Sequence, residues 1–303
     1  MRWRGRRQSS NIEDRRSLGG ARGGLGGGGG GLLRLLPIAF RFLGFKGTVI
    51  LLACIGAYGF ITGNLGGLLS VLGLQPETAV RQSSAPFHES AQEKELVEFV
   101  AVILADTEET WSALFQKHGK TYKPPHLVLF KDSVDSACGM AQSAMGPFYC
   151  PSDQKVYIDL GFYDQLKNRF KAPGDFAQAY VIAHEVGHHI QTLLGISQQV
   201  HAARRKLSEV DGNKLSVKQE LQADCFAGVW AYHADNARQL LEEGDVEEGL
   251  AAASAIGDDT LQKQSRGYVT PDSFTHGSST QRVKWFKIGL RGGDIASCNT
   301  FRN

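Results

Sequence analysis

Three histidines and one glutamate fall within six positions of the stretch AHEVGHHIQ, residues 183–191. His184 and His188 are four residues apart, so on a helix both imidazoles project from one face and can reach the same cation. Glu185 lies beside them and completes the pattern HExxH. Because a catalytic zinc ion needs a third protein ligand, the chain must fold so that a second segment packs against this helix.

The residues around this motif, 175–195, predict a long, half-buried helix. Asp175 and Gln178 form a capping-box pattern, and Gly195 can end the helix. His189 points about 100° away from His188 around the helix, which favours a structural role for it. The apolar positions recur at helical spacing: Ala179, Ile182, Ala183, Val186, Ile190 and Leu193.

A second helix is predicted over residues 216–236, where Ser216 and Gln219 form another capping-box pattern. Glu220 and Asp224 are four residues apart on one face of it. Isolated acids on a helix are ordinarily solvated, but apolar residues surround this pair, so the two carboxylates need buried partners. Glu220 is the candidate third zinc ligand. Asp224 is the candidate acceptor for the free ring N–H of a ligand histidine.

Taken together, the motifs resemble a known family, the bacterial "putative neutral zinc metallopeptidases" within the gluzincin group of zincins. The resemblance is close to full length and is carried by MRWRGRR, the apolar run at 47–63, SACGMAQSAMGPFYCPSDQKVYIDLGFY, VIAHEVGHHIQ, ELQADCFAGVWA and THGSSTQRVKWFKIGL. It implies an α+β, zincin-like fold in which His184, His188 and Glu220 bind Zn²⁺. It implies little about the substrate.

In such a site zinc lowers the pKa of its bound water, and Glu185 takes the water proton and passes it to the leaving amine. The chain is therefore expected to be a zinc-dependent endopeptidase that acts on peptides or unfolded protein. The alternative is a catalytically inactive binding or scaffold module that keeps the zincin fold and a structural zinc.

The developing oxyanion needs a further donor, and His276 in SFTHGSSTQR is the candidate. His276 precedes a helix whose first turn carries a third capping-box pattern, Ser278 with Gln281. Similar Thr-His segments follow the ligand helix in related membrane gluzincins. His276 as a simple loop residue remains the alternative, in which case Arg282 or Tyr157 could serve.

The body, residues 88–303, is expected to form the metallopeptidase domain. Residues 88–119 predict a packing helix, and 126–130 and 155–160 predict strands rich in β-branched and aromatic residues. GMAQSAMG, residues 139–146, lies between the strands as a loop or an irregular edge strand. Its small residues could let a substrate backbone pair with the sheet, or it could be an ordinary disulfide-closed loop.

The N-terminal part of the chain differs in composition from the body. Residues 1–46 carry ten Arg or Lys against two acids, so the overall net charge of +2 hides a basic tail and a mildly acidic body. The tail is Gly-rich and nearly free of aromatics, which predicts disorder. It also lacks the interleaved aromatics of nucleic-acid binders, so no nucleic-acid partner is expected. An anchored nucleic-acid binder therefore ranks a distant third, after the endopeptidase and the inactive module.

An uncharged run at residues 47–63 is the candidate membrane span, with 64–74 at the interface and 75–87 as a linker. The basic residues before the run predict a cytoplasmic N-terminus and a periplasmic body, anchored in a bacterial inner membrane by one helix. A cleaved signal peptide and a buried core helix are the alternatives.

Five cysteines complete the candidate features. Cys54 lies in the predicted span, and the other four lie in the body, where an oxidising compartment would favour bridges. Spacing and the family resemblance favour a bridge between Cys138 and Cys150. Cys225 either pairs with Cys298 or is a simple apolar residue of a buried helix.

Overall fold

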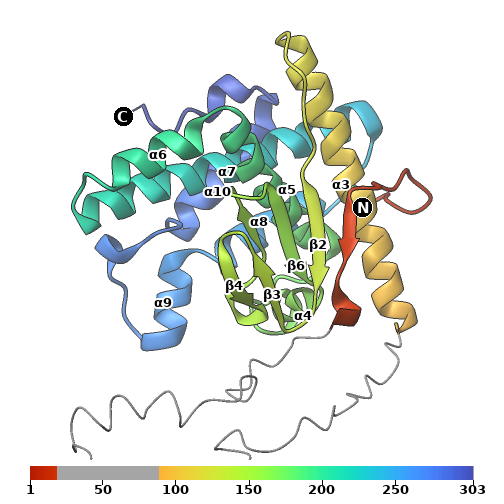
Figure 1. The fold of residues 1–303 in the computed structure, drawn as a ribbon, viewed down its shortest axis with the longest axis horizontal. Helices are drawn as coiled ribbons and strands as arrows, with labels where there is room; N and C mark the ends of the chain where they lie inside the picture. Colours follow the sequence, from red (N-terminus) through yellow and green to blue (C-terminus); the bar gives the residue numbers. More distant parts are fainter. Residues whose placement is uncertain (19–88, 303) are drawn as a thin grey trace, which may run out of the picture. The chain divides into compact units, whose positions relative to one another are not determined.

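The computed structural model describes residues 1–18 and 89–302, and its centre is a four-stranded sheet in the order β1-β2-β6-β5 (Figure 1). β2 pairs in parallel with β1 and with β6, and β5 pairs antiparallel with β6 and forms one edge. The predicted strands at 126–130 and 155–160 are confirmed as β2 and β6. The bounds are β1 Ile12–Asp14, β2 His126–Phe130, β5 Phe148–Cys150 and β6 Lys155–Asp159.

A second, two-stranded sheet occupies the segment predicted as a loop or edge. β3 (Ser133–Ser136) and β4 (Gly139–Gln142) form an antiparallel hairpin, and η3 (Ser143–Met145) follows it. A disulfide joins Cys138 in the hairpin turn to Cys150 at the end of β5, as predicted. The second candidate pair is also bonded, because Cys225 on α7 pairs with Cys298.

Helices make up most of the rest, so the expected α+β class is confirmed. α3 (Ala91–Lys117) is the predicted packing helix, with a capping box between Ser90 and Glu93. Among the described residues the longest helix is α7 (Glu209–Arg238). The other helices in this part of the chain are α4 Gly161–Asn168, α5 Asp175–Leu193, α6 Ile196–Arg204, α8 Asp245–Ala255, α9 Asp258–Arg266 and α10 Ser279–Gly292, with 3₁₀ turns η1 Arg16–Leu18, η4 Pro271–Ser273 and η5 Ile295–Cys298.

Two glycines set the distance between α7 and α10. A Cβ atom at Gly228 would lie 2.1 Å from the Phe286 carbonyl oxygen, and one at Gly289 would lie 2.0 Å from the Cys225 carbonyl oxygen. Any larger side chain at either position would therefore force the two backbones apart. This close packing joins the second half of α10 to residues 225–229 of α7.

Residues 1–18 belong to the folded body, so the prediction of a disordered tail is wrong for this segment. β1 adds a parallel strand next to β2, and Trp3 is buried with its ring edge-on to Phe99. Several arginines of the segment pair with acids, among them Arg4 with Glu95 and Arg7 with Glu109, whereas Arg6 donates to backbone carbonyls. Composition alone could not show this, because the acidic residues of α3 that pair with the basic tail lie far from it in the sequence.

The position of β1 also bears on the predicted membrane topology. Residues 1–18 and 89–302 belong to one compact unit. A single crossing between residues 18 and 89 would place β1 and β2 in different compartments, although they are hydrogen-bonded neighbours. The predicted opposite-sided orientation therefore cannot hold together with this sheet, and both segments must lie on the same side of any membrane.

Within the part of the chain that the structure describes, no helix is long and apolar enough to cross a membrane. The predicted span at 47–63, its continuation to residue 74 and the linker at 75–87 lie outside the described residues.

Candidate metal centre

α5 carries the HExxH residues into the interior of the fold, as their spacing predicted. The rings of His184 and His188 have centroids 4.8 Å apart. Gly187 between them lies against α7, where a Cβ atom would come within 3.0 Å of the Ala223 carbonyl oxygen. The missing side chain lets α5 and α7 pack closely, which brings the histidines to Glu220.

α5 begins where the sequence indicated but without the expected cap. Its N-cap is Gly174, and no side chain caps it, so the predicted capping box of Asp175 with Gln178 is wrong. The Asp175 carboxylate instead accepts hydrogen bonds of 3.2 Å from the Met1 α-amino group. A tertiary contact has replaced the local one.

α7 begins earlier than predicted. Its N-cap is Ser208, whose side chain accepts a hydrogen bond from the backbone N–H of Asp211. Ser216 lies inside the helix and donates to the Gly212 carbonyl, so the predicted cap at Ser216 is wrong. Two N-cap patterns occur in this stretch, and the first of them starts the helix.

The three candidate ligands form one cluster. Nε2 of His184 lies 3.2 Å from Oε2 of Glu220, and Nε2 of His188 lies 3.4 Å from the same oxygen. One donor atom from each residue falls within 4.8 Å of the other two. Two imidazole nitrogens and one carboxylate oxygen are the donor set of catalytic zinc sites of the His₂Glu type.

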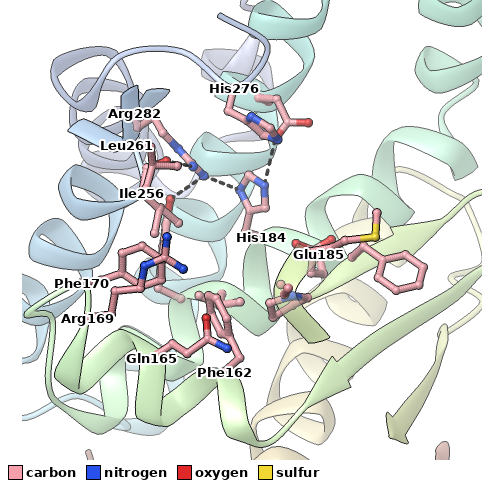
Figure 2. Close-up of a pocket in the computed structure, with 18 of the residues that line it drawn as sticks. Phe162, Gln165, Arg169, Phe170, His184, Glu185, Ile256, Leu261, His276 and Arg282 are labelled. Carbon is pink, nitrogen blue, oxygen red and sulfur yellow. Dashed lines mark hydrogen bonds and ion pairs between the residues drawn. The ribbon is translucent and has the colours of Figure 1, made fainter. Parts of the chain in front are cut away.

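Asp224 fixes the orientation of His184 from the far side of the ring. Nδ1 of His184 donates to Oδ1 of Asp224 at 2.8 Å, so Nε2 is the nitrogen that faces Glu220. The fully buried Asp224 carboxylate also accepts from the Tyr180 hydroxyl at 2.5 Å and from Arg282 at 2.9 Å. Figure 2 shows Arg282 directed toward His184 in this network.

Gln191 does the same for the second histidine, and the sequence reading missed it. Nδ1 of His188 donates to Oε1 of Gln191 at 2.9 Å. The Gln191 amide in turn donates to the Gln219 carbonyl at 2.7 Å and to the Gln222 side chain at 3.1 Å. Its position one turn after His188 in the HExxH helix was visible in the sequence, but an amide one turn along a helix is too common to single out.

The electrostatics of the cluster depend on these carboxylates. Burial alone would lower the pKa of His184, but Asp224 and Glu220 raise that pKa to about 10. Burial also acts to lower the pKa of His188, but the attraction of Glu220 is stronger, so the pKa of His188 is raised as well. Against the burial effect, the two histidines hold the pKa of Glu220 well below its usual range. In the metal-free cluster the His184 imidazolium therefore lies beside the Glu220 carboxylate, and a bound cation would replace its proton.

The cluster opens into a cavity of about 750 Å³. Glu185, which is only 7% exposed, lies in the wall beside the ligand histidines (Figure 2). The edge strand supplies Phe148 and Tyr149, and the segment before it supplies Gly146. Two imidazole nitrogens and one carboxylate oxygen face an open cavity, and the Glu185 carboxylate lies beside them. Such a site suits a metal ion that keeps one coordination position for water.

The family described as "Putative neutral zinc metallopeptidase" matches residues 1–301. The chain belongs to this family. "Uncharacterized protein YpfJ" of Escherichia coli strain K12 is 51% identical over 303 residues, which cover 99% of each chain. "Uncharacterized protein Mb2605" of Mycobacterium bovis is 44% identical over 190 residues, 59% of this chain and 63% of that protein. No solved structure matches the chain.

The predicted oxyanion donor, His276, lies within the residues that match the family. Its side chain lines the cavity and is 53% exposed. Asp258 at the start of α9 holds the segment around His276. One of its carboxylate oxygens accepts hydrogen bonds from the backbone N–H groups of Thr275, His276 and Gly277. The Asp258 carboxylate also raises the pKa of His276. The sequence reading missed Asp258 because it is distant in sequence from the segment that it orients.

The contacts of three other residues named in the sequence analysis indicate what role each can have. Tyr157 is buried on β6, donates its hydroxyl to Asp153 at 2.7 Å and does not line the cavity, so it is not an oxyanion donor. Arg282 lines the cavity but is bound to Asp224. His189 is structural as predicted, because its ring bonds to the Tyr149 hydroxyl and to a backbone carbonyl, and burial lowers its pKa to about 4.

Proposed function

We propose that the chain is a zinc-dependent endopeptidase with a zincin-like catalytic domain. The observation that carries the proposal is the cluster of His184, His188 and Glu220, with their donor atoms within 4.8 Å, in the wall of a cavity that Glu185 also lines. In this reading the cluster holds Zn²⁺. When bound, zinc supplies an acidified water and a polarising charge for the scissile carbonyl.

The protein's own residues then divide the remaining work. Glu185 accepts the proton of the attacking water and delivers it to the leaving amine, which its place next to the ligands allows. Asp224 and Gln191 keep both imidazoles in the tautomer whose Nε2 faces the ligand cluster. His276, held by Asp258, is the proposed hydrogen-bond donor to the developing oxyanion.

An extended peptide is the substrate that best fits this cavity. β5 is an edge strand, and Gly146, Phe148 and Tyr149 along it line the cavity. A peptide backbone can pair with such an edge and present one carbonyl to the metal cluster. The Cys138–Cys150 bridge keeps this edge in place.

The alternative is an inactive module with a structural zinc, which would normally be closed by a fourth protein ligand. Among residues 1–18 and 89–302, the cluster has three members, and it faces an open cavity. Both features favour catalysis over a structural role.

The test is zinc quantification combined with proteomic cleavage profiling of the full chain and of Glu185→Gln. We expect one zinc per chain in both proteins and cleavage of denatured protein by the wild type only. Stoichiometric zinc without cleavage by the wild type would support the inactive module. Cleavage by Glu185→Gln at the wild-type rate would contradict the proposed mechanism.

We also propose that the catalytic unit works in an oxidising compartment, which for a bacterial protein is the periplasm. The two disulfides support this location, because such bridges persist outside the reducing cytosol. Anchoring in the inner membrane through residues 47–74 remains a prediction, with the condition that residues 1–18 and 89–302 lie on the same side of the membrane.

A further inference from the structure

One wall of the cavity carries polar side chains that no part of the proposed chemistry uses. Gln165 on α4 and Arg169, which immediately follows that helix, are four residues apart and both line the cavity. Residues at this spacing share a helix face, so the face of α4 that carries Phe162 and Gln165 is directed at the cavity. Figure 2 shows both side chains, together with Phe170, in the cavity wall opposite His184.

The Arg169 guanidinium is an unneutralised charge at this wall. The Cζ atom of Arg169 lies 5.1 Å from the centre of the Phe170 ring, so the guanidinium is positioned by an aromatic face. Arg169 is exposed, and within residues 1–18 and 89–302 no acid forms an ion pair with it and no hydrogen bond involves its guanidinium or the side-chain amide of Gln165. Arg282, the other arginine of the cavity, differs because Asp224 neutralises it.

We propose that Arg169 and Gln165 form a subsite for a carboxylate of the peptide substrate. A guanidinium placed on an aromatic ring with its N–H groups free binds planar carboxylates in preference to neutral groups. Gln165 adds an amide donor one turn away. The opposite wall carries Glu185 and Glu220, so a peptide that reaches both walls keeps its anion away from those acids.

Two parts of a peptide can supply this carboxylate, an Asp or Glu side chain or the free C-terminus. Either source would make the enzyme prefer peptides with a carboxylate at this subsite. The HExxH residues by themselves do not produce such a preference. The subsite rests on the proposed peptidase function, because only a peptide substrate makes the anion a carboxylate at a fixed distance from the scissile bond.

The experiment uses three peptides built around one cleavage site. The first has an acidic side chain and an amidated C-terminus, the second has a free C-terminus and no acid, and the third has neither. Binding is measured by fluorescence anisotropy with zinc-loaded Glu185→Gln, and kcat/KM is measured with the active enzyme. Each measurement is repeated with Arg169→Gln, Arg169→Lys and, as a control, Lys167→Gln. Lys167 carries the same charge at the end of α4, two residues before Arg169, but does not line the cavity.

We expect one of the two carboxylate peptides to bind and be cleaved about tenfold better than the neutral peptide, the scale of one charge-assisted hydrogen bond in a partly solvated site. Arg169→Gln should remove the preference, Arg169→Lys should keep part of it, and Lys167→Gln should keep all of it. The preferred peptide identifies the source of the carboxylate.

Equal binding of all three peptides, or no measurable binding of any, would overturn the subsite. So would equal losses in Arg169→Gln and Lys167→Gln, which would indicate a general charge effect. The two proposals can fail separately. Carboxylate-dependent binding without cleavage by the active enzyme would refute the peptidase and keep the subsite, and cleavage without a carboxylate preference would do the reverse.

Discussion

The carboxylate of Asp224 holds three groups at once, the imidazole of His184, the phenol of Tyr180 and the guanidinium of Arg282. Asp224→Asn should therefore have two effects. Loss of the charge should weaken zinc binding by about 10-fold to 100-fold, because His184 loses its anchor. It should also destabilise the fold by about 3–5 kcal/mol, because the buried Arg282 is left without its counter-ion. Zinc titration and denaturant unfolding of the same variant measure both, and unchanged stability would contradict this account of Arg282.

Glu220→Ala should separate these two effects. Glu220 contacts the two ligand histidines but does not hold Arg282, so its removal should abolish most zinc affinity and activity with a smaller loss of stability. Zinc content after dialysis and the unfolding midpoint are the measurements. If this variant binds zinc as tightly as wild type, Glu220 is not the third ligand.

Zinc binding should depend steeply on pH. In the metal-free protein the pKa of His184 is raised to about 10, so its ring holds a proton near neutral pH, and the raised pKa of His188 favours a proton on that ring as well. Since zinc binds neutral imidazole, it has to displace these protons, and its apparent affinity should rise with pH. We expect a gain between about tenfold and a hundredfold per pH unit from pH 6 to 8, measured by competition with a chelator. An affinity that is flat over this range would mean that the rings are neutral before zinc binds.

At this scale the sequence was informative wherever function follows helical spacing. His184, His188, Glu220 and Asp224 lie together as their four-residue intervals predicted. Asp258 could not be found in this way, because its partners come from a segment that only the tertiary fold brings near.

Among the elements, the contact between α7 and α10 decides how Arg282 meets Asp224. Gly289→Ala should destabilise the protein by more than about 2 kcal/mol, because its Cβ atom would lie 2.0 Å from a backbone oxygen that cannot move aside. The matched control is Gly292→Ala on the same helix, where nothing lies within 4 Å of the added atom and the effect should be neutral or slightly stabilising. Equal unfolding midpoints for the two variants would contradict the close packing of these helices.

Periodicity and propensity predicted α3, α5, β2 and β6, because each is long or strongly patterned. They failed at the start of α7, where two N-cap patterns compete, and at β1, a strand of three residues. A strand that short has no readable alternation, and its pairing with β2 depends on contacts that form only in the folded body.

For the whole molecule, the sheet predicts that residues 1–18 and 89–302 are accessible from the same side of a membrane. Gln8→Cys and Ser152→Cys place single thiols at exposed positions of the two segments in a Cys54→Ser background. The other four cysteines are bridged. In intact cells, a membrane-impermeant maleimide should label both positions or neither. Labelling of only one would contradict the shared sheet in the membrane-bound protein.

The pairing of β1 with β2 also sets a schedule for synthesis. Ile12 leaves the ribosome early, but its partner Leu127 follows only after the whole intervening chain. At ordinary elongation rates the first strand waits on the order of ten seconds for its neighbour. During that interval Trp3 and the arginines around it lack the surface of α3 that later covers them. The N-terminal segment is thus made before the surfaces of α3 and β2 that it packs against, and it can dock only after they have been synthesised.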